Sequence, residues 1–577
     1  MQDFPWYRFV YICSPLKVPA SGMKRVYGFD SEAYTTGEPF LFCLSSGDTF
    51  SPSSFLQEIF TRQYRNSNFI CYNLKYESGA LLYHLPESVK RTLYEEEKAE
   101  WDGMRIYMIG YKHLRFTRGS NSVSFWDVSP FYRMRLGDAA VKYLGEKKIV
   151  EDVTRYTPDS VKDRMKEIIS YCRKDAEITE GLYRLVENRF AKFGVYFKKL
   201  YSPAYVSFKY FVKHSDIVTL DDFLPENPRC VKYATYAFHG GKFEMTARGK
   251  GDFWEYDINA AYPNEIRNLL DIRGAKVVNS LEYVKEAQYA FLHVRFKHLD
   301  DIHHPVPIRL NGPYIYPIGE YSAYITKAEY DFLVRHGVKV DILDAEWIIV
   351  KEKKYPYREV IDKLYYERAK YKGKDEAVYS LFKVIMNSFY GKMVQKPMEG
   401  KRFYKVYSGW NTVYGAIITA NVRCRISEMQ QTHRDNIIAV HTDSIISRVP
   451  ISGLNGSKEI GDFSFTTKGM GVMIQCGFYQ IGDKVKTQSF ETEKGISLFD
   501  VLKWNRRKDT IDFEVVRPRS FKDTVRRGDF ENLNRFLKEI KGRNINKDSK
   551  RVWLRDVTCG DLLKDIYLSC PRIHYGS

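Results

Sequence analysis

Four carboxylates in the first third of the chain occupy positions from which they could hold metal ions. Asp30 and Glu32 follow the strand-like run KRVY, and residues two apart in a strand point to the same face. Glu77 follows the apolar run NFICY, and Asp175 lies four residues after Tyr171, on the same face of a helix. Carboxylates that gather repel one another unless a cation lies between them. Two Mg²⁺ ions held in this way would support phosphodiester hydrolysis, with Tyr171 orienting the attacking water.

A second group of candidate residues lies on two turns in the middle of the chain. Asp257 ends a strand-like run in FWEYDINAAYPNEI, where Pro263 marks a turn before a helix. Asp443 lies at the tip of a hairpin predicted for NIIAVHTDSIISRV. Two such carboxylates, with the backbone carbonyl of Ile258, can share a metal pair that clamps a nucleoside triphosphate and activates a hydroxyl. Taken alone, each is more commonly an ordinary turn aspartate, just as a D-x-E on an edge strand is often only solvated.

The segment EAVYSLFKVIMNSFYGKM between these turns predicts a helix with two distinct stripes. A lysine beside an asparagine and a tyrosine can hold a triphosphate and stack on a base, whereas a solvated face would carry more charge and fewer rings. Gly391 is expected to close the helix. The apolar stripe holds Val378, Leu381, Phe382, Ile385, Met386 and Phe389, and the other stripe holds Tyr379, Lys383, Asn387 and Tyr390.

The elements that must position these residues belong to a mixed α/β chain. A long amphipathic helix is predicted over 162–190 and a second helical block over 355–389. The chain has 577 residues, enough for about three to five domains, and its 44% hydrophobic content suffices for their cores. Nine scattered cysteines without zinc-ligand spacing favour reduced thiols, and we find neither a signal peptide nor a membrane-spanning run.

The charge balance suits a polyanionic partner. Lys and Arg number 90 against 72 Asp and Glu, a net charge of +18. The last 77 residues, 501–577, hold 19 Lys and Arg against 11 Asp and Glu, so they are a candidate grip for a nucleic-acid duplex. A merely soluble basic protein would show the same balance, so charge alone does not decide the partner.

The first group of residues, in its order and spacing, resembles the three exonuclease motifs of proofreading family B DNA polymerases. The resemblance implies a 3′→5′ exonuclease whose catalytic and metal-binding residues are Asp30, Glu32, Glu77, Tyr171 and Asp175.

This first match includes one substituted acidic residue and two further candidate residues. The family carries aspartate where this chain has Glu77, which keeps the charge but reaches one methylene further. Lys147 or Lys148 loosely matches the family's catalytic lysine, and Asn73 is expected to contact DNA.

The second group closely resembles the polymerase motifs of the same family. The matches are D-x-x-x-x-Y-P at Asp257, K-x-x-x-N-S-x-Y-G at Lys383, and the acidic turn of the hairpin. The resemblance implies that Lys383 binds the triphosphate and that Asn387 and Tyr390 help to form the pocket for the nascent base pair. Tyr262 resembles the steric gate, a ring under the sugar that would clash with a 2′-hydroxyl and so favour DNA synthesis.

The resemblance also implies the fold class and the ligands. The fold is expected to be α/β and α+β multidomain, with an RNase H-like exonuclease domain followed by a right-hand polymerase domain of palm, fingers and thumb. The implied cofactor is Mg²⁺, replaceable by Mn²⁺, with two ions per active site. The implied partners are template-primer DNA and dNTPs, with no membrane.

Within the family, the chain resembles the protein-primed branch found in small phages with linear genomes. Asp257 and Lys383 are 126 residues apart, which leaves room for an insertion like the one that contacts the terminal protein in that branch. AFHGGKFE resembles the Tyr-x-Gly-Gly linker of the branch, with DNA-contacting Gly240 and Gly241 and with Phe238 in the tyrosine's place. The expected domains are exonuclease 1–195, palm 196–265, terminal-protein insertion 266–355, fingers 356–395, palm 396–505 and thumb 506–577.

Three departures from the family pattern affect the expectations. His441 stands where the family has the first hairpin aspartate, which leaves Asp443 as the metal ligand. Gly477 stands where a lysine is expected in the primer-gripping motif, so that Tyr479 alone remains of its DNA contacts. Only 52 residues separate Gly391 from Asp443, so the second insertion of the branch is expected to be much reduced.

The leading hypothesis is therefore a replicative polymerase and exonuclease for a small linear viral genome, started from a terminal protein in the cytoplasm of a host cell. One alternative is a family B polymerase that extends ordinary primers in repair or gap filling. A second alternative, of a different class, is a catalytically weak scaffold that binds nucleic acid, motivated by Glu77, His441 and Gly477.

Overall fold

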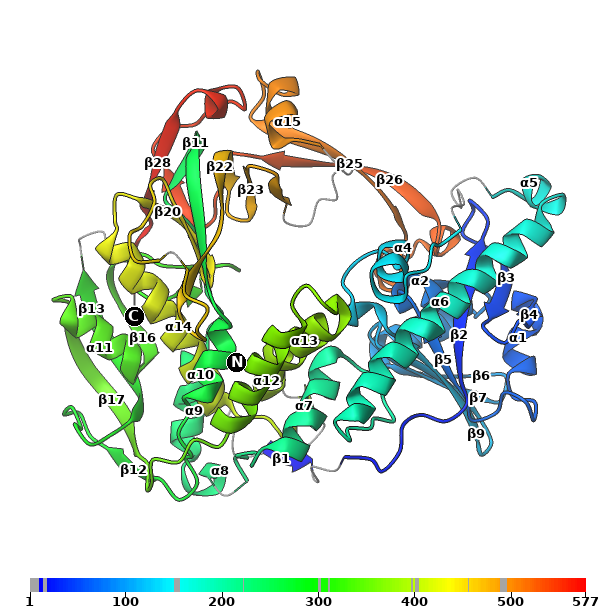
Figure 1. The fold of residues 1–577 in the computed structure, drawn as a ribbon, viewed down its shortest axis with the longest axis horizontal. Coiled ribbons are helices and arrows are strands. Elements are labelled where there is room, and N and C mark those ends of the chain that lie inside the picture. The colour runs from blue at the N-terminus through cyan, green and yellow to red at the C-terminus, as the bar shows by residue number, and fades with distance from the viewer. Residues whose placement is uncertain are drawn as a thin grey trace.

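The computed structural model describes residues 10–13, 18–149, 156–221, 223–298, 302–309, 312–395, 398–399, 404–454, 456–487 and 496–576. Two α/β halves lie side by side, an N-terminal half and a larger half formed by the rest of the chain (Figure 1). Helices join the halves on one side, and two long strands, β25 and β26, join them on the other. No described helix is long and apolar enough to cross a membrane, and no disulfide joins the eight cysteines whose side chains are described.

The N-terminal half is built on an eight-stranded mixed sheet of order β4-β3-β2-β5-β9-β8-β7-β6. β2 pairs in parallel with β5 and β5 with β9, whereas the outer strands pair antiparallel. The strands are β2 (Val26–Ala33), β3 (Pro39–Leu44), β4 (Thr49–Phe50), β5 (Asn68–Cys71), β6 (Lys98–Trp101), β7 (Met104–Ile109), β8 (His113–Arg118) and β9 (Asn121–Asp127). The helices around them are α1 (Pro52–Glu58), α2 (Leu74–Leu81), α3 (Glu87–Glu96), α4 (Leu136–Ala139), α5 (Pro158–Lys162) and α6 (Met165–Lys192).

The long helix predicted over 162–190 is confirmed as α6. It lies against β2, and a Cβ at Gly28 of β2 would come within 1.9 Å of the Ala176 carbonyl oxygen of α6. Only a glycine permits this approach, because any side chain would push the helix away from the sheet. The short distance between α6 and β2 brings the two acidic segments of the first candidate site together.

The larger half contains a nine-stranded sheet in which β10-β20-β21-β11-β22-β23-β24 form one path, while β28 pairs with β11 and with β27. The predicted hairpin is confirmed, with Asp443 between β20 and β21, and so is the predicted strand that ends at Asp257 and Ile258. The strands are β10 (Lys242–Met245), β11 (Ala247–Ile258), β20 (Ile437–Thr442), β21 (Ser444–Ser447), β22 (Phe463–Gln475), β23 (Phe478–Ile481), β24 (Lys484–Thr487), β27 (Arg551–Trp553) and β28 (Ile566–Pro571). The helices α10 (Ala261–Arg267) and α14 (Thr412–Thr432) accompany the sheet.

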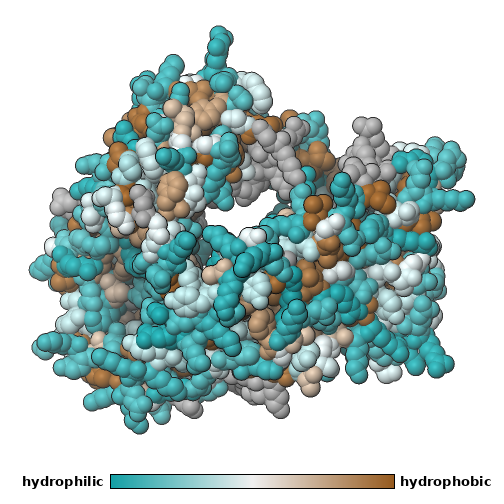
Figure 2. All heavy atoms as spheres, viewed as in Figure 1, coloured by the Kyte–Doolittle hydropathy of each residue, from teal (hydrophilic) through white to brown (hydrophobic). Residues whose placement is uncertain are grey.

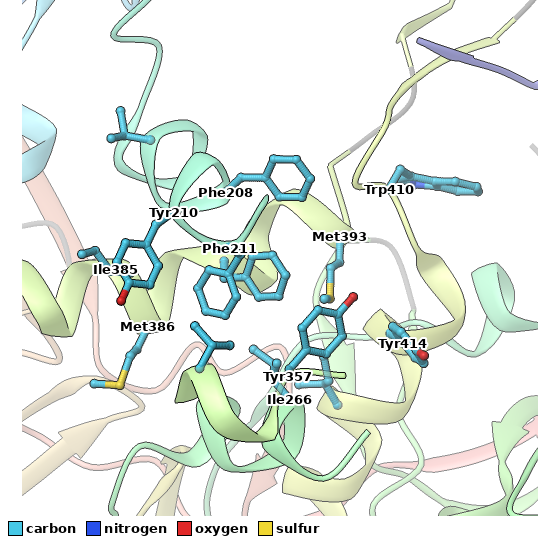
Figure 3. Packing of buried hydrophobic residues seen from close by; sticks show 14 of the residues in the cluster. Phe208, Tyr210, Phe211, Ile266, Tyr357, Ile385, Met386, Met393, Trp410 and Tyr414 are labelled. Carbon is cyan, nitrogen blue, oxygen red and sulfur yellow. The ribbon is translucent and has the colours of Figure 1, made fainter. Parts of the chain in front are cut away.

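Two neighbouring helices, α12 (Arg358–Tyr371) and α13 (Glu376–Met393), form the helical block predicted over 355–389. The apolar stripe of α13 packs on α7 (Pro203–His214), where Phe389 stacks on Phe211 with ring centroids 3.7 Å apart. Figure 3 shows this packing around Phe211 and Ile385. The expectation that Gly391 closes the helix is wrong, since α13 continues to Met393 and Gly391 faces α7 near Ala204.

A third sheet, of order β12-β17-β13-β16-β29, lies between α10 and α12 in the sequence. It has its own buried cluster around the fully buried Trp347, so this region is an inserted subdomain with a separate core. Its elements are β12 (Lys276–Asn279), β13 (Tyr289–His298), β16 (Ile318–Thr326), α11 (Lys327–Arg335), β17 (Lys339–Ile349) and, from the far end of the chain, β29 (Ile573–Gly576). A small pair, β14 (Ile308–Arg309) and β15 (Tyr314–Ile315), lies beside it, and α8 (Phe223–Glu226) and α9 (Pro228–Ala237) precede the palm.

Strand pairing at both ends of the chain crosses the linear domain limits expected from the sequence. The N-terminal strand β1 (Val10–Cys13) does not join the eight-stranded sheet but pairs with β19 (Tyr404–Tyr407), which also pairs with β18 (Met398–Glu399). The C-terminal stretch divides between three sheets, because β27 and β28 join the palm and β29 joins the inserted subdomain. Only β25 (Thr510–Pro518) and β26 (Phe536–Asn544), with α15 (Leu498–Trp504) and α16 (Phe521–Arg527), form the extended part expected of a thumb. Periodicity in the sequence does not specify such distant partners.

A buried ion pair ties the inserted subdomain to the palm. Arg423 of α14 and Glu329 of α11 are 2.6 Å apart and almost wholly buried. Arg423 also donates hydrogen bonds to the carbonyl oxygens of His239 and Gly240, so the pair fixes the segment that leads from α9 into the palm.

We therefore predict that Glu329→Ala destabilises the protein by about 3–5 kcal/mol, because it leaves the Arg423 guanidinium buried without its counter-charge. The matched control is Glu320→Ala, which loses only an exposed pair with Lys297 and should cost about 0–1 kcal/mol. Urea denaturation followed by circular dichroism measures both, and equal losses would contradict the role of the buried pair.

Candidate active sites

The structure brings the first group of carboxylates together in one cavity of about 670 Å³ in the N-terminal half. Asp30 and Glu32 come from β2, Glu77 from α2, and Tyr171 and Asp175 from α6. The ligand atoms of Asp30, Glu32 and Cys172 lie within 4.8 Å of one another. Asn73, which adopts a left-handed conformation with φ of 85° before α2, also lines the cavity.

Glu32, Glu77 and Asp175 are buried and Asp30 is half-buried, and the ionised carboxylates would repel one another. Burial raises the pKa of Asp30, and the neighbouring Asp175 raises it further. Burial also raises the pKa of Glu32, with further contributions from Asp30 and Asp175. The Oδ1 atom of Asp175 is buried without a hydrogen-bond partner. A divalent cation would supply the missing partner and the missing charge, so this donor set fits a metal site.

Two further residues complete the first cavity. Of the two candidate lysines, the structure brings Lys148 to the site, where it forms an ion pair with Asp175 and lies 4.9 Å from the Tyr171 ring centroid. Asp127, at the end of β9, accepts hydrogen bonds from the backbone N–H groups of Asn73 and Leu74 and so holds the start of α2. Sequence reasoning missed Asp127, although its position at the end of an apolar strand beside a polar turn was a usable signal. Ser31 donates a hydrogen bond to Glu77 and fixes that longer side chain.

The second group lies in a separate cavity of about 960 Å³ between the palm and the two finger helices. Asp257 and Asp443 face each other from paired strands, and the Ile258 N–H donates to the Asp443 carbonyl oxygen at 2.9 Å. Thr442, just before Asp443, has a φ of 65°, which tightens the turn that carries the carboxylate. Lys383 enters the same cavity from α13, next to Asn387 on the exposed stripe that the sequence predicts.

The raised pKa values of two carboxyl groups indicate that this cavity would favour a bound cation. Burial raises the pKa of Asp257 to about 7, with further contributions from Asp443 and Glu255, whereas Lys484 and Lys383 lower it. Burial also raises the pKa of Asp443. Asp257 Oδ1 is buried without a hydrogen-bond partner. The residues therefore fit a divalent metal, which would relieve the repulsion between the carboxylates.

Additional cations line the finger side of the cavity. Arg368 of α12 donates a hydrogen bond to the Tyr379 hydroxyl and lies 4.3 Å from the centroid of that ring. Lys372 lines the cavity beside Arg368. Sequence reasoning missed both residues, although the basic run RAKYKGK before α13 was a usable signal. With Lys383 they make this wall suited to a polyphosphate.

The ring of Tyr262 lies at the inner edge of the cavity and stacks on Tyr390 of α13, with centroids 5.2 Å apart. Gly241 lies behind it, where a Cβ would come within 2.7 Å of Thr442 Cγ2 and 3.0 Å of the Tyr262 hydroxyl. The second glycine of the linker is therefore required by packing. At Gly240 a Cβ would meet no atom within 4 Å, so packing does not require that glycine. Phe238 contacts Tyr390 more loosely, at 6.5 Å.

The two departures in the palm turn out to be neighbours. His441 stacks on Tyr479 with centroids 5.1 Å apart, and its Nε2 accepts a hydrogen bond from the Gly477 N–H. Burial lowers the pKa of His441 to about 3, so the ring is neutral at physiological pH. The structure thus contains an uncharged contact between the two positions where the family carries an aspartate and a lysine.

Tyr479 connects this uncharged contact to the metal-binding strand. Tyr479 is buried, and its hydroxyl donates to Glu255 Oε1 at 3.2 Å, while Lys484 Nζ lies 2.6 Å from Glu255 Oε2. A direct contact between Tyr479 and DNA stays a prediction. Glu255 and Lys484 were missed by sequence reasoning, although Glu255 precedes Asp257 by two residues, the same spacing that drew attention to Asp30 and Glu32.

The chain is similar to known DNA polymerases in part of its sequence and in its fold. A family model described as DNA polymerase type B, organellar and viral, matches residues 138–411. Phi29 DNA polymerase in complex with primer-template DNA and incoming nucleotides superposes with a TM-score of 0.66 at 15% identity, covering 90% of this chain and 100% of that one. Its orthorhombic crystal form gives a TM-score of 0.60 at 16% identity, covering 81% of this chain and 90% of that one. The shared fold confirms the expected fold class, and the matched segment is similar to the type B DNA polymerases of organellar and viral origin over slightly less than half of the chain.

Two curated proteins are similar in sequence. A DNA polymerase of Acidianus bottle-shaped virus (isolate Italy/Pozzuoli) is 23% identical over 283 residues, which cover 45% of this chain and 41% of that protein. A probable DNA polymerase of Neurospora intermedia is 23% identical over 261 residues, covering 42% of this chain and 26% of that protein. The matched segments therefore span less than half the length of either relative.

The raised pKa of Asp257 leads to a prediction about stability. The pKa is about 7 in the folded chain and near 3.8 in an ordinary environment, so ionisation of this carboxyl costs stability increasingly as the pH rises from about 4 to 7. In EDTA at pH 8, Asp257→Asn should therefore raise the Tm by at least about 2 °C. Added Mg²⁺ should raise the Tm of the wild type more than that of the variant.

The gain in EDTA should shrink towards pH 4, because the wild-type carboxyl is then protonated in the folded state and its ionisation no longer costs stability. Asp252→Asn, an exposed position on the same strand, is the matched control and should leave the Tm unchanged. Thermal unfolding followed by circular dichroism measures both variants, and a lower Tm for Asp257→Asn in EDTA would refute the electrostatic account.

Proposed function

We propose that this chain is a template-directed DNA polymerase with its own 3′→5′ exonuclease, which copies a small linear viral genome from a protein primer in the host cytoplasm. The observation that carries the proposal is the meeting of Asp257, Asp443 and Lys383 in one cavity, at the junction of palm and fingers. The separate acidic cavity of the N-terminal half supports the second activity.

In the polymerising site, Asp257, Asp443 and the Ile258 carbonyl would hold Mg²⁺ or Mn²⁺, two ions in all. Such ions stabilise the charge that develops on the transferring phosphoryl group. Lys383 and Arg368 are positioned to bind the triphosphate of a dNTP from the finger side. The stacked rings of Tyr262 and Tyr390 would lie under the sugar and base of the incoming nucleotide and exclude a 2′-hydroxyl.

Asn387, which lies one turn of α13 beyond Lys383 and lines the same cavity, would contact the nascent base pair. Gly240 and Gly241, which lead into the palm, are proposed to contact the template-primer through their backbone.

In the exonuclease site, Asp30, Glu32, Glu77 and Asp175 would hold the ions that hydrolysis requires. Tyr171 is positioned by its place beside Asp175 on α6 to orient the attacking water. Lys148, which pairs with Asp175, would stabilise negative charge on the cleaved phosphate once metal takes over that carboxylate. Asn73 would contact the single strand from the rim of the same cavity.

The inserted subdomain supports the proposal of protein priming. It lies between the Tyr262 motif and the finger helices, where the protein-primed branch carries its terminal-protein insertion, and it has an independent core. The alternative, extension of ordinary primers, needs no such subdomain but does not exclude one.

Two substitutions should separate the two activities. Asp443→Ala should lower Mg²⁺-dependent primer extension at least about 100-fold, because it removes a metal-binding carboxylate. The same variant should still degrade a single strand from its 3′ end. Asp30→Ala should show the reverse pattern, with extension retained and excision of a mismatched 3′ end lost. Denaturing gels of end-labelled primer measure both activities.

The matched control is Asp252→Ala, an exposed aspartate on the same strand as Asp257, which should keep both activities. Extension near the wild-type level by Asp443→Ala would overturn the site assignment. Mismatch excision by Asp30→Ala at the wild-type rate would place the exonuclease elsewhere.

Protein priming is tested by transfer of labelled dAMP to a terminal protein encoded beside this chain. We expect a labelled protein adduct that grows on addition of all four dNTPs and disappears with Asp443→Ala. Normal extension of a DNA primer without any adduct would favour the alternative, repair or gap filling from ordinary 3′ ends.

A further inference from the structure

The segment that joins β25 to β26, residues 519–535, is packed into the hydrophobic core of the N-terminal half. We call it the tip segment. Phe521 and Leu533 are fully buried and Val525 is 6% exposed. All three belong to the cluster that contains Phe29 of β2 and Leu93 of α3. The tip segment is therefore a part of the exonuclease core, although it lies more than 300 residues further along the chain.

Close backbone approaches and polar contacts accompany this packing. A Cβ at Gly37 would come within 2.2 Å of the Leu533 carbonyl oxygen, and one at Gly79 within 2.7 Å of Asn534 Oδ1. The backbone N–H of Lys522 donates to the Tyr111 hydroxyl at 3.0 Å. Glycines at both points of approach, together with the buried side chains, indicate a specific joint between the tip segment and the exonuclease domain.

The opposite end of the β25–β26 pair is anchored in the palm. Ile511 and Phe513 of β25 share a buried cluster with Val472 and Phe478 of the palm sheet. The nine residues of β25 span roughly 30 Å between these two anchors. On the other side of the molecule, α6, α7 and α13 share a single continuous core, which joins the exonuclease domain to the fingers. The two halves are thus joined twice.

Figure 2 shows an opening through the molecule in the same view as Figure 1. In Figure 1 it lies between α13, β22 and β23, the β25–β26 pair and the exonuclease half. The exonuclease cavity reaches this frame, because Pro518 and Phe536, at the tip ends of β25 and β26, line it. Residues 501–577, which supply that pair, carry a net positive charge, which suits a phosphate backbone.

We propose that the opening receives the primer-template duplex and that the tip segment is the latch that closes the chain around it. The proposal rests on the proposed function for the identity of the nucleic acid. A closed ring keeps the enzyme on DNA without the second insertion, which this chain has in reduced form at most. The latch must open, or a DNA end must thread through, before synthesis can start on a new molecule.

The experiment uses a disulfide to lock the latch. An ideal Cβ at Gly79 lies 3.3 Å from Asn534 Cβ, close to the separation in natural disulfides, so Gly79→Cys with Asn534→Cys should cross-link on oxidation. Oxidised before DNA is added, this variant should fail to extend a primer on a covalently closed circle. It should still extend the same primer on a linear template, and reduction should restore activity on the circle.

A binding measurement completes the test without needing catalysis. Oxidised after loading, the variant should stay on the circle through a high-salt wash and leave it when the circle is cut. The single variant Asn534→Cys is the matched control, and it should behave like the wild type. Where the cross-link does not form, Val525→Asp should open the latch and shorten retention of the uncross-linked enzyme on the circle, while single-strand degradation persists.

Equal extension on circle and linear template by the oxidised variant would overturn the proposal, and so would release from the intact circle in high salt. Loss of activity on both templates would also overturn it, because synthesis would then need an open latch. If the reduced variant fails to extend any primer but, once oxidised on the circle, shows salt-resistant retention, the polymerase function fails and the ring stands.

Discussion

The packing of α7 against α13 is the contact on which the arrangement of both sites depends. Phe211 and Phe389 stack within it at 3.7 Å, inside a core that runs from the exonuclease helix α6 to the palm helix α14. This contact buries the apolar stripe of α13. The other stripe, with Lys383 and Asn387, therefore faces the cavity that holds Asp257 and Asp443. The same core fixes the N-terminal half to α12 and α13 and so sets the distance between the two cavities.

Both cavities share one electrostatic design on unrelated scaffolds. In each, burial and then a neighbouring carboxylate raise the pKa of one carboxyl group, Asp30 in the first and Asp257 in the second. In each, one oxygen, on Asp175 or Asp257, is buried without a hydrogen-bond partner. A lysine opposes the repulsion in both, Lys148 in the first and Lys383 in the second. Such sites trade stability of the metal-free protein for affinity towards divalent cations.

The palm carries an uncharged contact between two positions where the family pattern has charged residues. A neutral His441 stacks on Tyr479 and accepts a hydrogen bond from the Gly477 backbone. Burial and the nearby Lys550, Lys484 and Lys486 keep the His441 ring neutral. The two departures from the family pattern are therefore one change, and Tyr479 keeps its place beside Glu255.

The sequence by itself determined the local elements that carry chemistry. The helix α6, the stripes of α13, the hairpin around Asp443 and the strand that ends at Asp257 follow from periodicity and turn residues, which act over a few neighbours. Only the tertiary structure decided which distant segments meet: Lys148 rather than Lys147 at Asp175, Arg368 beside Tyr379, β29 in the inserted sheet and the tip segment in the exonuclease core. These contacts join residues far apart in the chain, and burial and strand pairing select such partners by shape and geometry, which no local pattern records.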